Sequence, residues 1–175
     1  MTSSPRASLL APFWIAVCAL PAAGGCQCRE SKPATAAVEE QRNRDLAALP
    51  QAVGGLMEQL AAEASAREKD ADTLSLEAVV AKSGVAFEAP QQMLGRTVLA
   101  RYCASARSND GLTVTVCEYP SVDQAARGAA EVTAVRGKVS GWQAKQRKKS
   151  VLEVVARSDA KPESVASVLA AFDAL

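Results

Sequence analysis

The side chains that could do chemistry in this chain are its cysteines, because it contains no histidine. The five cysteines are Cys18, Cys26, Cys28, Cys103 and Cys117, in a chain of 175 residues. Without an imidazole, Ser-His-Asp and Cys-His catalysis are excluded within the chain, and the commonest transition-metal ligand is missing. No C-x-x-C spacing is present to activate a thiol. The cysteines therefore favour disulfide formation and covalent modification over catalysis.

Cys103 and Cys117 lie in two segments whose side chains alternate between apolar and polar. Residues 96–107 and 112–119 follow this period of two, so we predict two strands. A three-residue loop, Asn109-Asp110-Gly111, sets the cysteines directly opposite each other, which suits a disulfide. A loop of only two residues would place them on opposite faces as separate thiols. We predict the bridged pair, on the more polar face of the hairpin.

The first 25 residues have the composition of a cleavable secretory signal peptide. Arg6 is the only charged residue among them, and residues 9–20 form an uncharged apolar run of 12. A cationic start, a short apolar stretch and small residues before the cleavage point define such a signal. The run is shorter than the ~20 residues that a membrane-spanning helix needs. An uncleaved anchor is the alternative.

The residues Ala23-Gly24-Gly25-Cys26 resemble the lipobox of bacterial lipoprotein precursors, in which small residues precede an invariant cysteine. The resemblance covers residues 1–28, although Ala23 stands where the family usually has leucine. It implies that Cys26 carries a diacylglyceryl thioether and becomes the first residue after cleavage. Gln27, which is not acidic, favours the outer membrane facing the periplasm under the family's sorting rule. Ordinary secretion without a lipid is the alternative.

Two or more acyl chains would anchor the protein durably, so a membrane is the first expected partner. Arg6 is the only charge before Cys26, which leaves 19 basic and 19 acidic residues in residues 26–175. This balance argues against nucleic acid as a partner. We find no phosphate loop, dinucleotide fingerprint or metal-ligand cluster, and we predict no cofactor and no enzymatic activity. The oligomeric state is left open.

The chain after the signal peptide divides into three parts, which must position the cysteines discussed above. Residues 26–45 are polar and predict a flexible tether. Residues 46–95 predict a helical lead-in, with one helix starting near Pro50 and a second over residues 76–82. The apolar stripe of the first helix could form a coiled-coil seam, but we expect it to pack against the domain.

The sequence pattern of residues 96–175 predicts a folded domain that consists of two ββα units. Further strands are expected at residues 139–146 and 150–157, and helices start at Val122 and Pro162. We therefore predict an α+β fold in two layers. In it, a four-stranded antiparallel sheet in ββαββα order has both helices on one face and follows the N-terminal helices.

Two surfaces are candidates for binding. The open sheet face is expected to carry Arg101, the Cys103–Cys117 bridge, Arg107, Thr113, Thr115 and Tyr119, and suits an envelope protein partner. The second surface is a hairpin in a stretch without acidic residues between Glu131 and Glu153. Its cations, which could contact anionic lipid or polysaccharide, are Arg136, Lys138, Lys145, Arg147, Lys148 and Lys149.

Each surface has a simpler alternative. The sheet face could be exposed to solvent without a ligand, and the hairpin could be a solvated turn whose lysines discourage edge-to-edge pairing. We expect a membrane-anchored envelope lipoprotein with a non-enzymatic binding or assembly role. An electrostatic binder of anionic lipid or polysaccharide is the second hypothesis.

Overall fold

A computed structural model describes residues 34–50 and 54–175 of the chain. The predicted signal peptide and Cys26 lie outside these residues. The helices are α1 (Ala34–Ala47), α2 (Leu56–Ser65), α3 (Leu76–Ser83), the 3-10 helix η1 (Gly95–Val98), α4 (Val122–Arg136) and α5 (Pro162–Asp173). The strands are β1 (Gln91–Met93), β2 (Tyr102–Arg107), β3 (Leu112–Glu118), β4 (Trp142–Arg147) and β5 (Ser150–Ala156). Among the described residues, no helix has the length and apolar character to cross a membrane.

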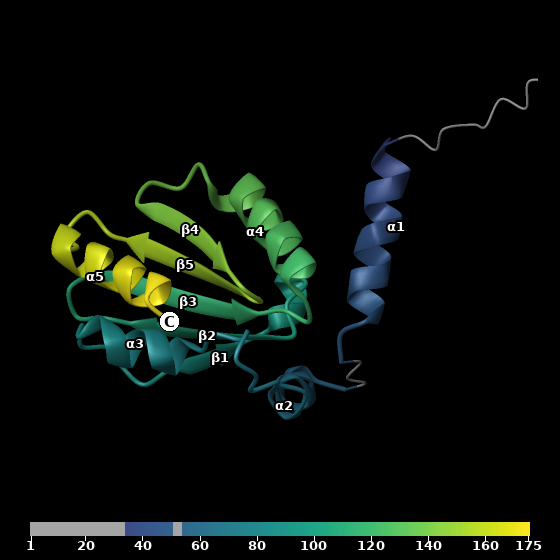
Figure 1. Cartoon of the computed structure of the whole chain (residues 1–175), viewed down its shortest axis with the longest axis horizontal. Helices are drawn as coiled ribbons and strands as arrows, with labels where there is room; N and C mark the ends of the chain where they lie inside the picture. The colour runs from purple at the N-terminus through teal and green to yellow at the C-terminus, as the bar shows by residue number, and fades with distance from the viewer. Residues whose placement is uncertain (1–33, 51–53) are drawn as a thin grey trace, which may run out of the picture. The chain divides into compact units, whose positions relative to one another are not determined.

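The strands form one antiparallel sheet in the order β1-β2-β3-β5-β4, drawn in Figure 1. The α+β class and the antiparallel sheet are confirmed, but the predicted count of four strands is wrong. The additional strand, β1, pairs with β2 through only three residues, Gln91 opposite Ser105 to Met93 opposite Cys103. It follows Pro90 and has no alternating pattern, so a local sequence signal for it is lacking.

The β2–β3 hairpin has the predicted register. Ser108 N–H donates to Leu112 O at 2.9 Å, and Cys103 lies directly opposite Cys117. Gly111 has a φ of 88°, the left-handed conformation that a three-residue loop demands and that glycine adopts without strain. The turn residues therefore determine which side chains meet across the hairpin.

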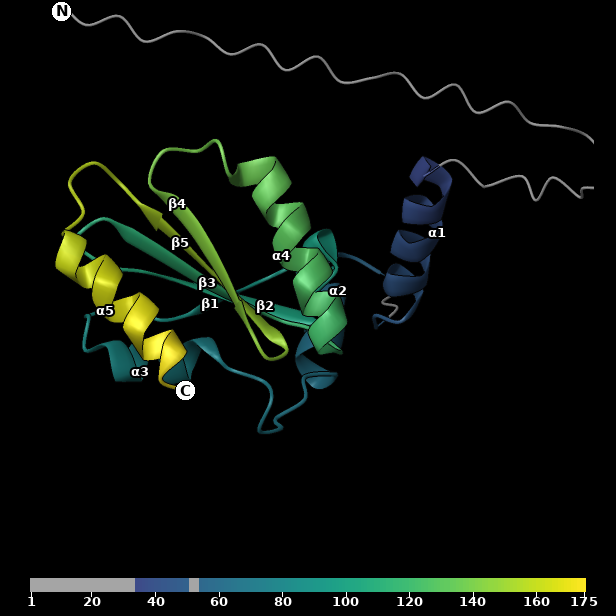
Figure 2. The same ribbon diagram turned by 45° about the horizontal axis from the view of Figure 1, so that its top comes forward.

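The two long helices cover opposite faces of the sheet, so the expectation that they share one face is wrong. Even-numbered residues of β2, β3 and β5 pack with Val79 of α3 and Phe172 of α5. On the other face, Ala125 of α4 packs with Tyr119 and Val151. Figure 2 shows α5 and α4 on either side of the strands. Cysteine and tyrosine readily become buried, which makes this second face apolar enough to hold a helix.

Local capping signals set the starts of the helices as predicted. Ser75 Oγ accepts from Ala78 N–H, and Gly84 ends α3 with a φ of 70°. Ser121 Oγ accepts from Gln124 N–H at the start of α4, and Pro162 occupies the first turn of α5. At the helix starts, Ser75 and Ser121 each satisfy a backbone donor that the first turn leaves unpaired, and Pro162 has no such donor.

Residues 96–101, predicted as the beginning of a strand, instead form η1 and a tight turn. Leu99 follows η1 with a φ of 61°, which is uncommon for a bulky residue, and it is buried. Glu63 of α2 accepts hydrogen bonds from Gly95 N–H and Arg96 N–H at 2.9 and 3.0 Å. A carboxylate from outside the segment therefore stabilises the start of η1.

Part of the predicted tether is helical. Helix α1 occupies residues 34–47, where Ala, Glu, Gln and Arg give high helix propensity without an apolar stripe. Arg127 of α4 binds Asp45 of α1 through two hydrogen bonds of 2.8 and 2.9 Å. Helix α2 begins at Leu56, after the residues where we predicted its start, of which 51–53 lie outside the description.

Candidate binding surface

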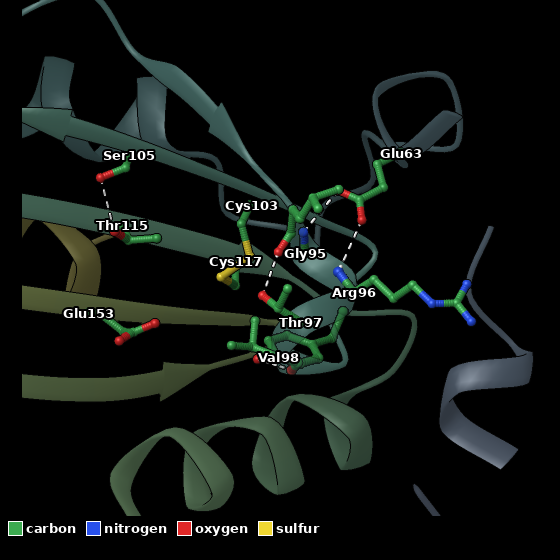
Figure 3. The surroundings of a disulfide bond; sticks show 12 residues. Glu63, Gly95, Arg96, Thr97, Val98, Cys103, Ser105, Thr115, Cys117 and Glu153 are labelled. Atoms are coloured by element: carbon green, nitrogen blue, oxygen red, sulfur yellow. Dashed lines mark hydrogen bonds between the residues drawn. A yellow bond between two sulfur atoms is a disulfide. The ribbon is translucent and has the colours of Figure 1, made fainter. Parts of the chain in front are cut away.

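The predicted disulfide between Cys103 and Cys117 is present, and it lies in a covered part of the sheet. Its Cα atoms are 4.2 Å apart, and each cysteine is only 2% exposed. Val98 of η1 and Ala129 of α4 pack in the same cluster, and Figure 3 shows η1 beside the bridge. The expectation that the bridge lies on an open surface is therefore wrong.

Tyr119, predicted as a binding residue, is buried beneath α4. Its Oη donates to Val98 O at 3.2 Å, and burial, followed by the charge of Glu153, raises the pKa of the phenol. Gly128 of α4 lies directly over the ring, where a Cβ would overlap the phenol. The expectation that Tyr119 lies on the open sheet face is wrong, because helix α4 covers it.

Arg101 takes part in an internal contact. Its guanidinium pairs with the Glu68 carboxylate, and 18% of its side chain is exposed. Nearby, Lys149 Nζ lies 2.6 Å from Asp70, and this hydrogen bond is the main cause that lowers the pKa of Asp70 to about 2. Charged pairs therefore hold the segment that joins α2 to α3 against the ends of the strands.

The same end of the sheet contains an ion pair, built on the buried carboxylate of Glu118, that we did not predict. Arg67 donates to Glu118 through Nε and Nη2 at 2.6–3.0 Å and to Glu77 at 3.1 Å. Its guanidinium carbon lies 4.4 Å from the centroid of the Tyr102 ring. Burial raises the pKa of Glu118 although Arg67 opposes it. These groups line a hollow of about 500 Å³, but their charges are already satisfied within the chain.

Three residues of the predicted open face remain accessible, and we call them the open strip: Ser105, Arg107 and Thr113. Thr115 lies beside them but is buried. Arg107 lies opposite Thr113, and Ser105 lies opposite Thr115. Thr115 Oγ1 donates to Ser105 Oγ at 3.1 Å, shown in Figure 3, and Ser105 Oγ donates to Val114 O. Arg107 is exposed, and Ser105 and Thr113 are partly exposed.

A hollow of about 180 Å³ lies beside the open strip at the β1 edge. Its lining includes Gln91, Met93, Ser105 and Arg107. The strip and this hollow together offer hydroxyl, amide and guanidinium groups and the Glu88 carboxylate next to an exposed methionine. Such a surface can bind a polar partner through hydrogen bonds.

Half of the six cations in the basic hairpin stretch are neutralised by acidic side chains of the described chain. Lys145 Nζ lies 2.6 Å from Asp173, and Arg136 Nη1 lies 3.0 Å from Glu153. Lys148, with a φ of 51°, donates to Ala71 O at 2.8 Å, and Lys149 binds Asp70 as described above. Of the predicted cations, Lys138, Arg147 and Lys148 have no acidic partner among the described residues.

A third hollow, of about 450 Å³, lies between α1 and α4. Val38, Leu99 and Ala130 give it an apolar lining, and the Asp45–Arg127 pair is at its rim. Hydrogen bonds from Arg127, Gln41 and Gln124 outweigh the effect of burial and lower the pKa of Asp45. The sequence contained no signal for this site, because it depends on a helix where we predicted a tether.

No group of three or more Cys, Asp or Glu side chains in the described part of the chain is arranged to hold a metal ion. The buried carboxylates Glu63, Asp45, Glu118 and Glu153 each accept hydrogen bonds from the chain itself. Their arrangement therefore supports folding roles, with each carboxylate holding a different segment.

The chain matches no protein-family model, and comparisons with curated proteins and with solved structures find no significant match. Function must therefore be argued from the residues themselves.

Proposed function

We propose that this chain is a lipid-anchored protein of the bacterial cell envelope, attached through Cys26. The observation that carries the proposal is the Cys103–Cys117 disulfide. Structural disulfides persist in oxidising compartments and are rare in the cytosol, so this bond supports export. The small residues Ala23, Gly24 and Gly25 before Cys26 supply a matching export and lipidation signal.

The domain then acts as a non-enzymatic binding or assembly module, facing the periplasm from the outer membrane. Its contact surface is the open strip, because other predicted binding residues, Arg101 and Tyr119, are engaged within the chain. Arg107 is the central group, since its exposed guanidinium can form charge-assisted hydrogen bonds with an acidic or carbonyl group of an envelope protein.

Binding of anionic lipid or polysaccharide through the basic hairpin receives less support. Lys145, Lys149 and Arg136 each have an acidic partner in the chain. Electrostatic attachment to an anionic surface gains about 1 kcal/mol per nearby cation, so neutralised cations weaken it.

Intact mass spectrometry of the membrane-extracted protein tests the anchoring, with thiols alkylated without prior reduction. We expect a chain that starts at Cys26, carries acyl mass and has one alkylated thiol, Cys28. Cys26→Ser should abolish the acyl mass, whereas the matched control Cys28→Ser should retain it. A chain without acyl mass, or acylation that survives Cys26→Ser, would refute anchoring through Cys26.

Site-specific cross-linking in native membranes tests the binding role. A photoreactive residue at Thr113 should give a discrete adduct, and Arg107→Glu should remove it. The same probe at Ser158, outside the open strip, and the variant Arg157→Glu serve as matched controls. An adduct that is unchanged by Arg107→Glu would exclude the open strip as the contact surface.

A further inference from the structure

Strand β4 leaves one of its edges without a partner strand among the described residues. It is the last strand of the sheet and pairs only with β5. Ala156 N–H donates to Gly141 O at 2.8 Å, which shows that odd-numbered residues in this part of the chain exchange hydrogen bonds with β5. The N–H and C=O groups of Trp142, Ala144 and Gln146 therefore point out of the sheet.

One of these outward groups is already used. Trp142 N–H donates to Val139 O at 3.2 Å in the preceding turn. The C=O of Trp142 and both backbone groups of Ala144 and Gln146 have no partner strand in the described chain. Figures 1 and 2 place β4 at the rim of the sheet, with α5 and α4 on either side of it. This edge therefore presents backbone groups with which a second strand can pair.

Lys145, the lysine on β4, does not carry a free charge that would repel a strand pairing at this edge. Edge strands are usually protected by charged side chains that repel an incoming strand. Lys145 Nζ is instead bound to Asp173 of α5 at 2.6 Å, so its charge is compensated on the α5 face. The outward-bonding residues Trp142, Ala144 and Gln146 are all uncharged.

We propose that two copies of this chain pair through β4, antiparallel and about a two-fold axis at Ala144. In this register the two Ala144 residues exchange both backbone hydrogen bonds. Gln146 N–H of each copy donates to Trp142 O of the other, so Trp142 N–H keeps its bond to Val139. The two sheets become one continuous sheet, which removes this free edge from both copies.

The positions of the charged side chains on β4 favour this register over the registers shifted by two residues. Lys145 lies opposite Gln143 of the second copy, and Arg147 lies opposite Gly141, so no like charges meet. Sliding the copies by two residues one way sets Lys145 against Lys145, which is unfavourable. Sliding them the other way leaves both Gln146 backbones unpaired. An acidic extended peptide is a different occupant of the same edge, and the experiment below distinguishes it.

Thiol cross-linking of the full chain tests the register, in a background of Cys18→Ser, Cys26→Ser and Cys28→Ser. Mild oxidation should convert Ala144→Cys into a disulfide-linked dimer. Gln143→Cys and Lys145→Cys should not cross-link alone but should cross-link when mixed. No cross-linking of Ala144→Cys, or equal cross-linking at all three positions, overturns the proposal.

Sedimentation velocity over a concentration series tests the dimer without added thiols. The full chain should form a dimer that Ala144→Pro abolishes, because proline removes an N–H that points out of the sheet. The fold should survive, since proline is tolerated on the free side of an edge strand. Ala144→Lys, which opposes two like charges, should abolish the dimer as well. A monomer at every concentration, including one that binds acidic peptides, or a dimer that persists in both variants, refutes the inference.

Discussion

Arg67 and Glu118 are 51 positions apart in the sequence, yet the guanidinium of Arg67 donates to both oxygens of the Glu118 carboxylate. Glu118 is 3% exposed, so its carboxylate is removed from water, whereas Arg67 is partly exposed. The same principle recurs around the sheet, where a buried carboxylate holds one peripheral segment in each case. These pairs are Glu118 with Arg67, Glu153 with Arg136 and Trp142, Asp45 with Arg127, and Glu63 with the start of η1.

Arg67→Ala should destabilise the fold strongly, because it leaves the Glu118 carboxylate buried without its partner. Removing one member of a buried pair typically costs roughly 3–5 kcal/mol. Urea unfolding of the purified protein measures the loss. Arg157→Ala is the control, since its ion pair with Asp159 is exposed on both sides and should contribute little.

Replacing both Arg67 and Glu118 separates the cost of burying the two charges from the attraction between them. Arg67→Met with Glu118→Leu should recover most of the stability lost in Arg67→Ala, because an apolar pair avoids the desolvation of two charges. A double variant as unstable as Arg67→Ala would mean that the hydrogen bonds and attraction of Arg67 outweigh the desolvation that an apolar pair avoids.

The parts of the fold that could be predicted from the sequence depend on local signals. The turn at Gly111 determines the Cys103–Cys117 register, and Ser75 and Ser121 cap the helices expected over residues 76–82 and from Val122. Each of these contacts spans only a few residues. The misses depend on distant contacts. The η1 turn is held by Glu63, more than 30 positions earlier, and β1 is defined by its pairing with β2.

The candidate site was predicted less well than the fold, for a related reason. Alternation correctly placed Arg107 and Thr113 on one face, but it does not reveal which part of that face a helix covers. Tyr119 is polar only at its hydroxyl, so its ring is buried once Val98 O accepts that group.

Gly128→Ala should lower stability, although alanine normally stabilises a helix by about 1 kcal/mol relative to glycine. The added methyl overlaps the Tyr119 ring, and overpacking typically costs about 1–3 kcal/mol. Thermal unfolding checks the sign. The helix control Thr133→Ala, on the exposed side of α4, should be neutral or stabilising. Stabilisation by Gly128→Ala would mean that α4 does not press on Tyr119.

Removing the disulfide should lower the stability of the domain. Cys103→Ala with Cys117→Ala should lower the free energy of unfolding by about 2–4 kcal/mol, since the bridge closes a loop with a sequence separation of 14. Denaturant unfolding of both proteins under non-reducing conditions measures the difference. Equal stability would show that the hairpin and its covering helices suffice without the covalent bond.

Acidification should release α1 from α4. The pKa of Asp45 is lowered in the folded chain, so its contribution is present above the ordinary aspartate pKa and is lost as the pH falls through the folded value. Hydrogen exchange of the α1 amides, measured against Asp45→Asn at each pH, isolates this effect from the pH dependence of exchange itself.

At neutral pH, Asp45→Asn should exchange faster in α1 than the unmodified chain, because Arg127 loses its ionic partner. As the pH falls below the ordinary aspartate pKa, the two proteins should converge, since protonated Asp45 is neutral as well. The sheet amides should stay protected in both, because Asp45 contacts α4 and no strand residue among its described hydrogen-bond partners. A difference that persists unchanged at low pH would show that the asparagine disturbs α1 through its shape, and the ion pair would not be the contact that docks this helix.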